Sequence, residues 1–400
     1  MIATLSARGK YNSRCAEKRP DRGGFEPNNY VHTVAPDDRL VGSSLLSNHD
    51  VVGTVRPVLW KLARRSGLLR AWRRKNRYRI GILAAHGVMD DGNGASWRPL
   101  WRRLHVEHFE RTLRLLQRYY EFVSLSEAAQ MLKGDLAPRP HCMVLTFDDG
   151  YRNNFTHALP VLERLRIPAT FFVCPGLIGT RGSYWIDRLD YVIQHLPRQE
   201  RIIPVRTGGI ALNFQNRELL ASSYLQLRLA LKRNYQSDLE QRVDELAAEL
   251  EREAGVRLAD VIEHDPWAAT MSWDESRLAK QRGAEIGSHT VDHVRLSLAE
   301  PDTVWDQLTR SRSAIEGELG VACTSLAYPN GDYTPAVAAA AQQAGYVCAV
   351  TTLSGLNGPG EDLFTLRRIT FPMREHPDHI LGLASGFQAA VAELRGRKAG

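Results

Sequence analysis

The sequence predicts an α/β fold built from about seven βα units, a barrel related to the TIM barrel. Between residues 78 and 394, short apolar runs alternate with segments in which apolar residues recur every three to four positions. This alternation is typical of a parallel sheet covered by helices. The acidic pair Asp148–Asp149 follows one apolar run, and His289 follows another. Because the chemistry of such barrels lies where the strands end, we expect one site to contain both.

The expected strands and helices alternate along the chain. The strands are short apolar runs at 80–84, 142–145, 168–174, 284–288, 324–328, 346–351 and 366–371. One helix carries its apolar face on Phe109, Leu113, Leu116 and Tyr120. The other expected helices cover 125–132, 158–165, 274–282, 302–319, 335–344 and 377–394.

The alternation is interrupted at about residues 184–265. The clearest helix there is Asp238–Glu253, whose leucines and valine recur at spacings of three and four. We therefore expect a barrel over 78–394 with a helical insertion over its rim. Residues 1–52 mix Gly, Pro, Asn, Ser and Arg with little periodicity, which predicts a disordered extension.

The positive charge belongs to one segment. The 400 residues are 43% hydrophobic and 24% charged, which is ordinary for a globular protein, and the formal net charge is +7. Residues 53–77 form a basic amphipathic segment. Within it, Val58–Lys75 is expected either to dock on the domain as a surface helix or to lie on an anionic membrane surface with Trp60 and Trp72 at headgroup level. No nucleic-acid-binding motif is present, so nucleic acid is not an expected partner.

Cysteine usage and the absence of targeting signals bear on location. The five cysteines include no CxxC pair, and four lie in apolar runs, so we expect buried, reduced thiols. No signal peptide or membrane-spanning segment is visible. These features predict a cytoplasmic protein, with a peripheral position at the membrane as one option.

Two short stretches carry the chemistry. Asp148 and Asp149 stand in a turn ended by Gly150, where two carboxylates facing one pocket repel each other unless a cation is present. His289 and His293 are four residues apart and reach one ion if the residues between them turn. Alternatively, the two Asp residues only cap the following helix, and the two His residues are solvated.

These stretches also carry a resemblance. Thr146-Phe147-Asp148-Asp149-Gly150, then His289-Thr290-Val291-Asp292-His293, then Ala327-Tyr328-Pro329-Asn330-Gly331 resembles the polysaccharide deacetylase family, which shares the NodB homology domain. The resemblance covers roughly residues 79–390. It implies a distorted (β/α)7 barrel and a hydrolase that uses a divalent metal, usually zinc, to remove acetyl groups from glycans.

The resemblance also implies roles for individual residues. Asp149, His289 and His293 match the metal ligands, and Asp148 matches the general base. The main-chain N–H of Asn330 matches the donor to the oxyanion. Two imidazoles and one carboxylate leave positions open on a zinc-like ion, which suits activation of water.

The sequence departs from the family pattern at two positions. Ala327 stands where the best-known members have an Arg that orients the base; Arg368 is our candidate replacement and Arg367 the second, unless both are surface residues of an edge strand. The His that serves as general acid has no clear match, and His86, His376, His379 or none of them could take that role.

Three functions follow from these patterns. The leading hypothesis is a metal-dependent deacetylase of a polysaccharide, oligosaccharide or lipid-linked amino sugar in envelope or exopolysaccharide synthesis. The second is a non-catalytic saccharide-binding relative. The third is a metal-dependent amidase that acts on a small non-sugar substrate.

Overall fold

Seven parallel strands close into a barrel in the computed structural model, which describes residues 64–90, 95, 97–101, 104–235, 238–373 and 377–388. The strands are β1 (Ile80–Ala85), β5 (Cys142–Phe147), β6 (Thr170–Val173), β9 (Glu285–Ser288), β10 (Ser325–Ala327), β11 (Cys348–Ser354) and β13 (Leu366–Thr370). Each pairs in parallel with the next, and β13 pairs with β1 to close the ring. The predicted seven-unit barrel is confirmed.

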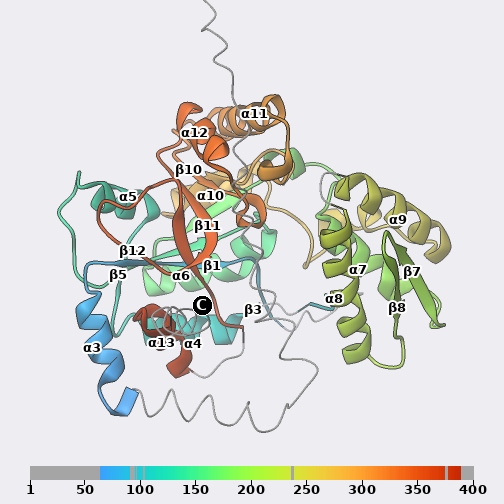
Figure 1. The fold of residues 1–400 in the computed structure, drawn as a ribbon, viewed down its shortest axis with the longest axis horizontal. Helices are drawn as coiled ribbons and strands as arrows, with labels where there is room; N and C mark the ends of the chain where they lie inside the picture. The colour runs from blue at the N-terminus through green and yellow to red at the C-terminus, as the bar shows by residue number, and fades with distance from the viewer. Residues whose placement is uncertain are drawn as a thin grey trace, which may run out of the picture. The chain divides into compact units, whose positions relative to one another are not determined.

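Helices surround this barrel (Figure 1). They are α4 (Val106–Leu116), α5 (Leu125–Lys133), α6 (Leu159–Leu165), α10 (Trp273–Gln281), α11 (Pro301–Leu319), α12 (Pro335–Gln343) and α13 (Pro377–Ala384). Side-chain caps fix several starts; for example, Ser272 and Glu275 form a reciprocal capping box at α10. The predicted helix 377–394 is interrupted, because α13 ends at Ala384 and Gly386 turns the chain at φ 77°; residues 389–394 lie outside the described part.

Strand residues alternate between the barrel interior and the helices. Ile82, Val144, Phe172, Val350 and Leu366 belong to an interior cluster that α5 also joins. Their neighbours along the strands belong to the larger cluster shared with the surrounding helices. Because strand side chains alternate with period two, residue 368 shares the inward direction of Leu366, and residue 367 does not.

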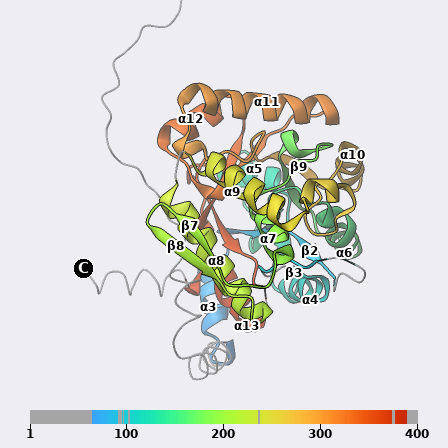
Figure 2. The same ribbon diagram turned by 90° about the vertical axis from the view of Figure 1, so that its right-hand side faces the viewer.

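Residues 185–254 form an insertion with its own apolar cluster, which lies beside the barrel (Figures 1 and 2). It contains α7 (Trp185–His195), β7 (Arg201–Val205), β8 (Gly208–Leu212), α8 (Arg217–Asn234) and α9 (Leu239–Ala254). The expected helices are present, but the insertion is not helical throughout, since β7 and β8 pair as an antiparallel hairpin. The strands are short and β7 contains Pro204, which obscured them in the sequence.

The described part of the basic segment is docked on the domain. A break at Ser66–Gly67 precedes α3 (Leu68–Lys75). Leu69 is buried, and the Trp72 ring packs edge-on against Phe387 with centroids 5.9 Å apart. This packing supports the docked surface helix, one of the two alternatives. Trp72 is half-buried, and contact of this segment with a membrane stays a prediction. Residues 1–52, together with Val58 and Trp60, lie outside the described residues.

The remaining features are the cysteines and the apolarity of the helices. Cys142, Cys174, Cys323 and Cys348 are buried and free, as expected; Cys15 lies outside the described part. Among the described helices, none is both long enough and apolar enough to span a bilayer.

Candidate metal centre and catalytic site

The acidic turn follows directly from the end of β5. The Asp148 N–H donates to the Ala85 carbonyl at 2.9 Å, which extends the pairing of β5 with β1 by one residue. Asp149 then adopts a left-handed backbone with φ 69°. Gly150 follows at φ 58°, and a Cβ there would lie 3.0–3.2 Å from Val173 of β6. Only glycine tolerates both conditions, so Gly150 allows the turn to present Asp149 at the barrel mouth.

The two histidines converge on Asp149 from the end of β9. His289 Nδ1 lies 2.7 Å from the Ala327 carbonyl, which can only accept, so Nδ1 carries the proton and Nε2 is free to bind. His289 Nε2 is 3.5 Å from Asp149 Oδ1, and His293 Nε2 is 3.6 Å from the same oxygen. Thr290 and His293 have φ values of 65° and 61°, which supply the turn that this convergence requires.

These three side chains fit a divalent ion. Their ligand atoms all lie within 4.8 Å of one another. Two ligands of a tetrahedral zinc ion, each about 2.1 Å from it, are about 3.4 Å apart, close to both distances measured from Asp149. The carbonyl that holds His289 Nδ1 is the type of outer partner that orients metal-binding imidazoles. The structure thus brings the three predicted ligands, Asp149, His289 and His293, together in one cluster. Their binding of metal stays a prediction.

The ionisation of His293 and Asp149 suits ligands as well. At His289 burial lowers the pKa, but the hydrogen bond to Asp149 and the charges of the two carboxylates outweigh it and raise the pKa above its usual value. Burial, followed by the charge of His289, lowers the pKa of His293 to about 3, so this imidazole is neutral near pH 7. Burial raises the pKa of Asp149, but the hydrogen bond to His289 and the nearby histidines outweigh it and bring the pKa below its usual value. The cluster therefore offers an ionised carboxylate and a neutral imidazole, the forms that bind metal.

Arg368 forms a buried, two-pronged ion pair with Asp148. Its Nη1 and Nη2 donate to the two carboxylate oxygens, each at 2.7 Å, and its Nε donates to the Thr351 carbonyl at 2.7 Å. Arg368 is 2% exposed, whereas Arg367 is exposed. The alternative that both arginines lie on an edge strand is wrong, since β13 pairs on both sides and Arg368 points into the barrel. Its role as an orienting residue stays a prediction.

This pair determines the charge of Asp148. Burial alone raises the pKa of a carboxyl group. At Asp148 the charge of Arg368 and its hydrogen bonds outweigh burial, so the pKa lies below its usual value. Asp148 is therefore ionised and able to accept a proton.

Asn330 borders the same cluster. It follows β10 in a short turn, with φ 58°. The turn begins at Pro329, two residues after Ala327, whose carbonyl holds His289. Of the six non-glycine residues with positive φ in the described ranges, four belong to this site: Asp149, Thr290, His293 and Asn330. Strained backbone concentrated in one place is typical of functional sites.

The candidates for the general acid are in different surroundings. His86 is half-buried after β1, and its charge lowers the pKa of both Asp148 and Asp149, so it lies near the cluster. His379 is in α13, which packs on α3 and α4, and its Nε2 is 2.9 Å from Gln388 Oε1. This arrangement does not bring His379 to the site. His376 lies outside the described residues.

Two site residues were missed at the level of sequence. The Tyr184 hydroxyl donates to the Asp149 carbonyl at 2.6 Å, and its ring packs edge-on against His293. Lys232 Nζ donates to Asn330 Oδ1 at 2.8 Å. Both side chains come from the 184–265 region, so only the packing of that region against the barrel brings them here. The aromatic pair Tyr184–Trp185 was visible in the sequence, but nothing marked Lys232.

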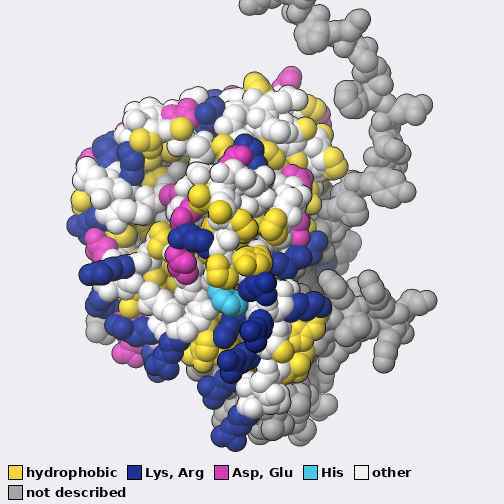
Figure 3. All heavy atoms as spheres, turned by 90° about the vertical axis from the view of Figure 1, so that its left-hand side faces the viewer, with side chains coloured by type: hydrophobic (Ala, Val, Ile, Leu, Met, Phe, Trp, Pro, Cys, Tyr) yellow, Lys and Arg dark blue, Asp and Glu magenta, His cyan; other side chains and the backbone are white. Residues whose placement is uncertain are grey.

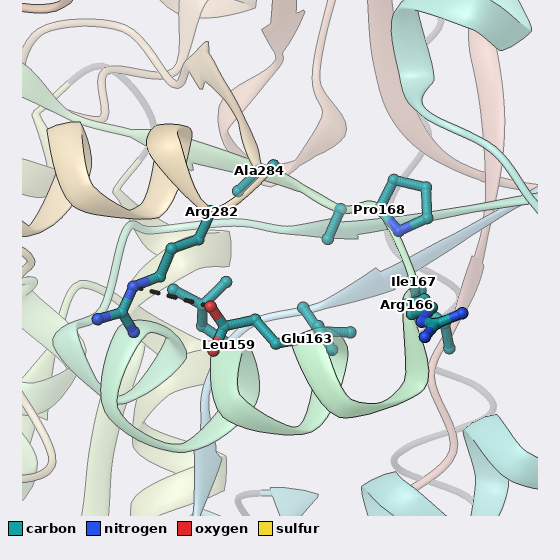
Figure 4. Close-up of a pocket in the computed structure, with 10 residues that line it drawn as sticks. Leu159, Glu163, Arg166, Ile167, Pro168, Arg282 and Ala284 are labelled. Atoms are coloured by element: carbon teal, nitrogen blue, oxygen red, sulfur yellow. Dashed lines mark ion pairs between the residues drawn. The ribbon is translucent and has the colours of Figure 1, made fainter.

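Two cavities lie apart from this cluster. One of about 390 Å³ is at the opposite end of the barrel, where β6 and β9 begin, and the ion pair between Arg282 and Glu163 crosses it (Figure 4). None of the site residues lines it. A second, of about 350 Å³, lies on the side of the barrel where β1 and β13 end and is lined by Met89, Asp90, His105, His108, Arg111, Trp267 and Met373. Only the second has a position suited to an extended substrate.

Comparisons with known proteins agree with the sequence motifs. The family model described as polysaccharide deacetylase matches residues 135–203 and 243–349. YxkH of Bacillus subtilis (strain 168), whose name assigns it to the polysaccharide deacetylases, is 22% identical over 292 residues, 73% of this chain and 71% of YxkH.

Solved structures were compared as well. The Streptococcus pyogenes deacetylase PplD in complex with acetate has a TM-score of 0.49 and 19% identity, with 77% of this chain and 99% of PplD covered. IcaB from Ammonifex degensii has a TM-score of 0.49 and 17% identity, with 77% of this chain and 97% of IcaB covered.

Proposed function

We propose that this chain removes N-acetyl groups from a polysaccharide, an oligosaccharide or a lipid-linked amino sugar. The chain belongs to the polysaccharide deacetylase family and is therefore a hydrolase of carbon–nitrogen bonds other than peptide bonds. The observation that carries the proposal is the pairing of Asp148 with Arg368 beside the Asp149, His289 and His293 cluster. Asp148, Asp149, His289 and Arg368 are buried at the end of the barrel where the strands terminate, and His293 is half-buried beside them, so a proton acceptor and a metal-binding set lie close together.

Asp149, His289 and His293 would hold one divalent metal, with zinc favoured by their ligand types. When bound, such an ion supplies Lewis acidity, which activates water and polarises the acetyl carbonyl. The Asp148 carboxylate accepts the proton of the attacking water, and Arg368 keeps that carboxylate ionised and oriented. The Asn330 main-chain N–H donates to the oxyanion that develops on the acetyl group.

The leaving amine must then receive a proton. Asp148 holds one after the attack, and His86 is the second proton donor near the cluster. Transfer of a proton from Asp148 or His86 to the nitrogen allows the carbon–nitrogen bond to break, which releases acetate and the free amine. We favour His86 over His379 because the latter lies in α13 beside Gln388.

The alternative functions have less support. A non-catalytic saccharide-binding role was considered because an expected Arg and an expected His are both missing from the motifs. The contact between Arg368 and Asp148 removes the first of these two reasons. A role as an amidase on a small non-sugar substrate requires the same residues, and no observation favours it. Zinc, exopolysaccharide synthesis and a cytoplasmic location remain parts of the proposal.

Membrane contact is also proposed, in an electrostatic form. Lys and Arg side chains gather on the lower part of the face in Figure 3, over α3. Arg70, Arg74 and Lys75 of α3 are exposed, while Leu69 is buried against the domain and Trp72 is half-buried. Cations on a surface attract anionic lipid without insertion of apolar residues.

The deciding experiment is acetate release. Purified protein is incubated with N-acetylated and O-acetylated oligosaccharides, with lipid-linked amino sugars and with small N-acetylated amides that are not sugars, with and without a chelator. We expect release from at least one N-acetylated substrate, loss of activity with chelator and recovery with zinc. Release that is unaffected by chelator would contradict the metal-dependent mechanism, and activity only on non-sugar amides would favour the amidase.

A further inference from the structure

The insertion contributes a lysine to the edge of the site. Lys232 lies near the end of α8 and is half-buried. Its Nζ donates to Asn330 Oδ1 at 2.8 Å, across 98 residues of sequence. An ammonium donor makes this a charge-assisted hydrogen bond, which is stronger than one between neutral groups. A residue outside the barrel is thus bonded to the turn that follows β10.

That turn needs support on more than one side. Asn330 has a left-handed backbone, which a residue with a Cβ adopts only at a cost. Thr352 Oγ1 donates to the Asn330 carbonyl at 3.2 Å, and Gly331 packs so closely on Thr352 that any added Cβ would overlap it. These contacts hold the carbonyl side of Asn330. The hydrogen bond from Lys232 holds its side chain.

Lys232 is itself rigidly placed. Leu227 and Leu231 of α8 are fully buried in the apolar cluster of the insertion, and the Tyr224 hydroxyl donates to the Ile186 carbonyl. The insertion makes a second contact with the site, because Tyr184, just before α7, donates to the Asp149 carbonyl. Two sides of the site, the metal-binding Asp and the turn of Asn330, are therefore bonded to the same inserted region.

We infer that Lys232 is a positioning residue, which holds the Asn330 turn so that its main-chain N–H is aimed at the acetyl oxyanion. The inference rests on the proposed deacetylase function and deepens it: the insertion completes the catalytic site of the barrel. An oxyanion donor acts only when its hydrogen already points to where charge develops. A turn in a left-handed conformation with one support removed samples other orientations, and the donor is then misaligned for part of the time.

The kinetic test is a double-mutant cycle. Lys232→Met retains the length of the side chain and removes the donor, while Asn330→Gly removes Oδ1 and retains both the N–H and the left-handed conformation. Arg233→Met is the matched control, because it removes one charge from the next residue of α8, which is exposed. With a neutral N-acetylated oligosaccharide, we expect Lys232→Met to lower kcat about tenfold, part of the loss seen when an oxyanion donor is removed, with little change in KM.

The cycle separates the possible roles of Lys232. If Lys232 acts through Asn330, the Lys232→Met change has no further effect in the Asn330→Gly background. Independent, multiplying effects with a raised KM would mean that Lys232 binds substrate directly and would overturn the inference. A fall in Tm with unchanged kcat would assign Lys232 a purely structural role and would also overturn it.

A second measurement does not depend on catalysis. Hydrogen–deuterium exchange of peptides that cover residues 328–333 should be faster in Lys232→Met than in the wild type and unchanged in Arg233→Met. If the wild type releases no acetate from any substrate, the proposed function fails, and this exchange still tests whether Lys232 holds the turn. Equal protection in both variants would refute the positioning role.

Discussion

Asp148 keeps its charge in a position where burial alone would favour the neutral acid. Arg368 reverses that balance, and it does so with both oxygens engaged at 2.7 Å. The two adjacent Asp residues thus have different partners: Asp148 faces an arginine, and Asp149 faces two histidines. Different partners allow neighbouring carboxylates to take different roles, one as a proton acceptor and the other as a ligand.

This division of roles can be tested by exchanging each carboxylate for its amide. Asp148→Asn should retain the metal and lower kcat by at least about a hundredfold, the usual contribution of a placed general base. Asp149→Asn should lose metal and activity together. Metal content by elemental analysis and kcat are measured on the same samples, with exposed His264→Ala as a control. Metal loss in Asp148→Asn with retention in Asp149→Asn would require the two roles to be exchanged.

Removal of the arginine should appear in the pH dependence. Arg368 lowers the pKa of Asp148, so in Arg368→Met burial dominates and the pKa rises. The ionised base is then lost at a higher pH, and the acid limb of kcat/KM moves to higher pH. In the wild type, stability from this pair is present above the unfolded pKa of about 3.9 and is lost as the pH falls through the lower folded value.

Two variants make this test specific. Arg367→Met changes the exposed neighbour on β13 and should leave the acid limb unmoved. Arg368→Lys keeps a charge and loses the two-pronged geometry, so it should give a smaller shift, and it provides a folded protein if Arg368→Met does not fold. An acid limb that stays in place in both Arg368 variants would show that Asp148 is not the base.

At the scale of elements, the strand ends organise the site. Its residues follow β5, β9 and β10 directly, and Arg368 lies within β13. The residues that follow β5, β9 and β10 could be predicted from the sequence, because apolar runs mark the strands and the motifs come directly after these runs. The choice between Arg367 and Arg368 was harder, since the two arginines are adjacent and only the register of β13 decides which side chain points inward.

Contacts that depend on the insertion could not be predicted from the sequence. The β7–β8 hairpin is short and contains a proline, and the position of Lys232 against Asn330 depends on how α8 packs. Tertiary placement of this kind leaves no local periodicity in the sequence. The same reason explains why Tyr184 was noted only as the start of the insertion.

The turn after β10 gives a prediction at this scale. Gly331→Ala should lose both stability and activity, because φ is 74° and the new Cβ would overlap Thr352. Gly134→Ala is the matched control, with φ 95° at the end of α5 and open space around it. Backbone strain alone costs about 1 kcal/mol, and overpacking adds about 1–3 kcal/mol. Denaturant unfolding should therefore rank Gly331→Ala as the less stable variant, and equal free energies of unfolding would contradict the steric argument.

At the scale of the whole molecule, the barrel and the inserted region together form the site, and the basic helix α3 forms part of a charged face. The barrel supplies the reacting groups, and the insertion contacts them through Tyr184 and Lys232. On the face of Figure 3, α3 adds cations, while its apolar side is used for packing through Leu69 and Trp72. Deletion of residues before Tyr78 would thus remove charge and uncover Phe387 at once, so point variants are the cleaner test of membrane contact.

The final prediction separates charge from packing on α3. Arg70, Arg74 and Lys75 are exposed, and each cation near an anionic surface contributes about 1 kcal/mol before screening. Changing all three to Gln should weaken co-sedimentation with anionic vesicles, and binding of the wild type should fall as salt rises. The control changes Arg198, Arg233 and Arg252, which are exposed in the insertion, to Gln. Equal loss in both triple variants would mean that net charge governs the binding, and unchanged binding in both would leave α3 as a docked surface helix without a lipid partner.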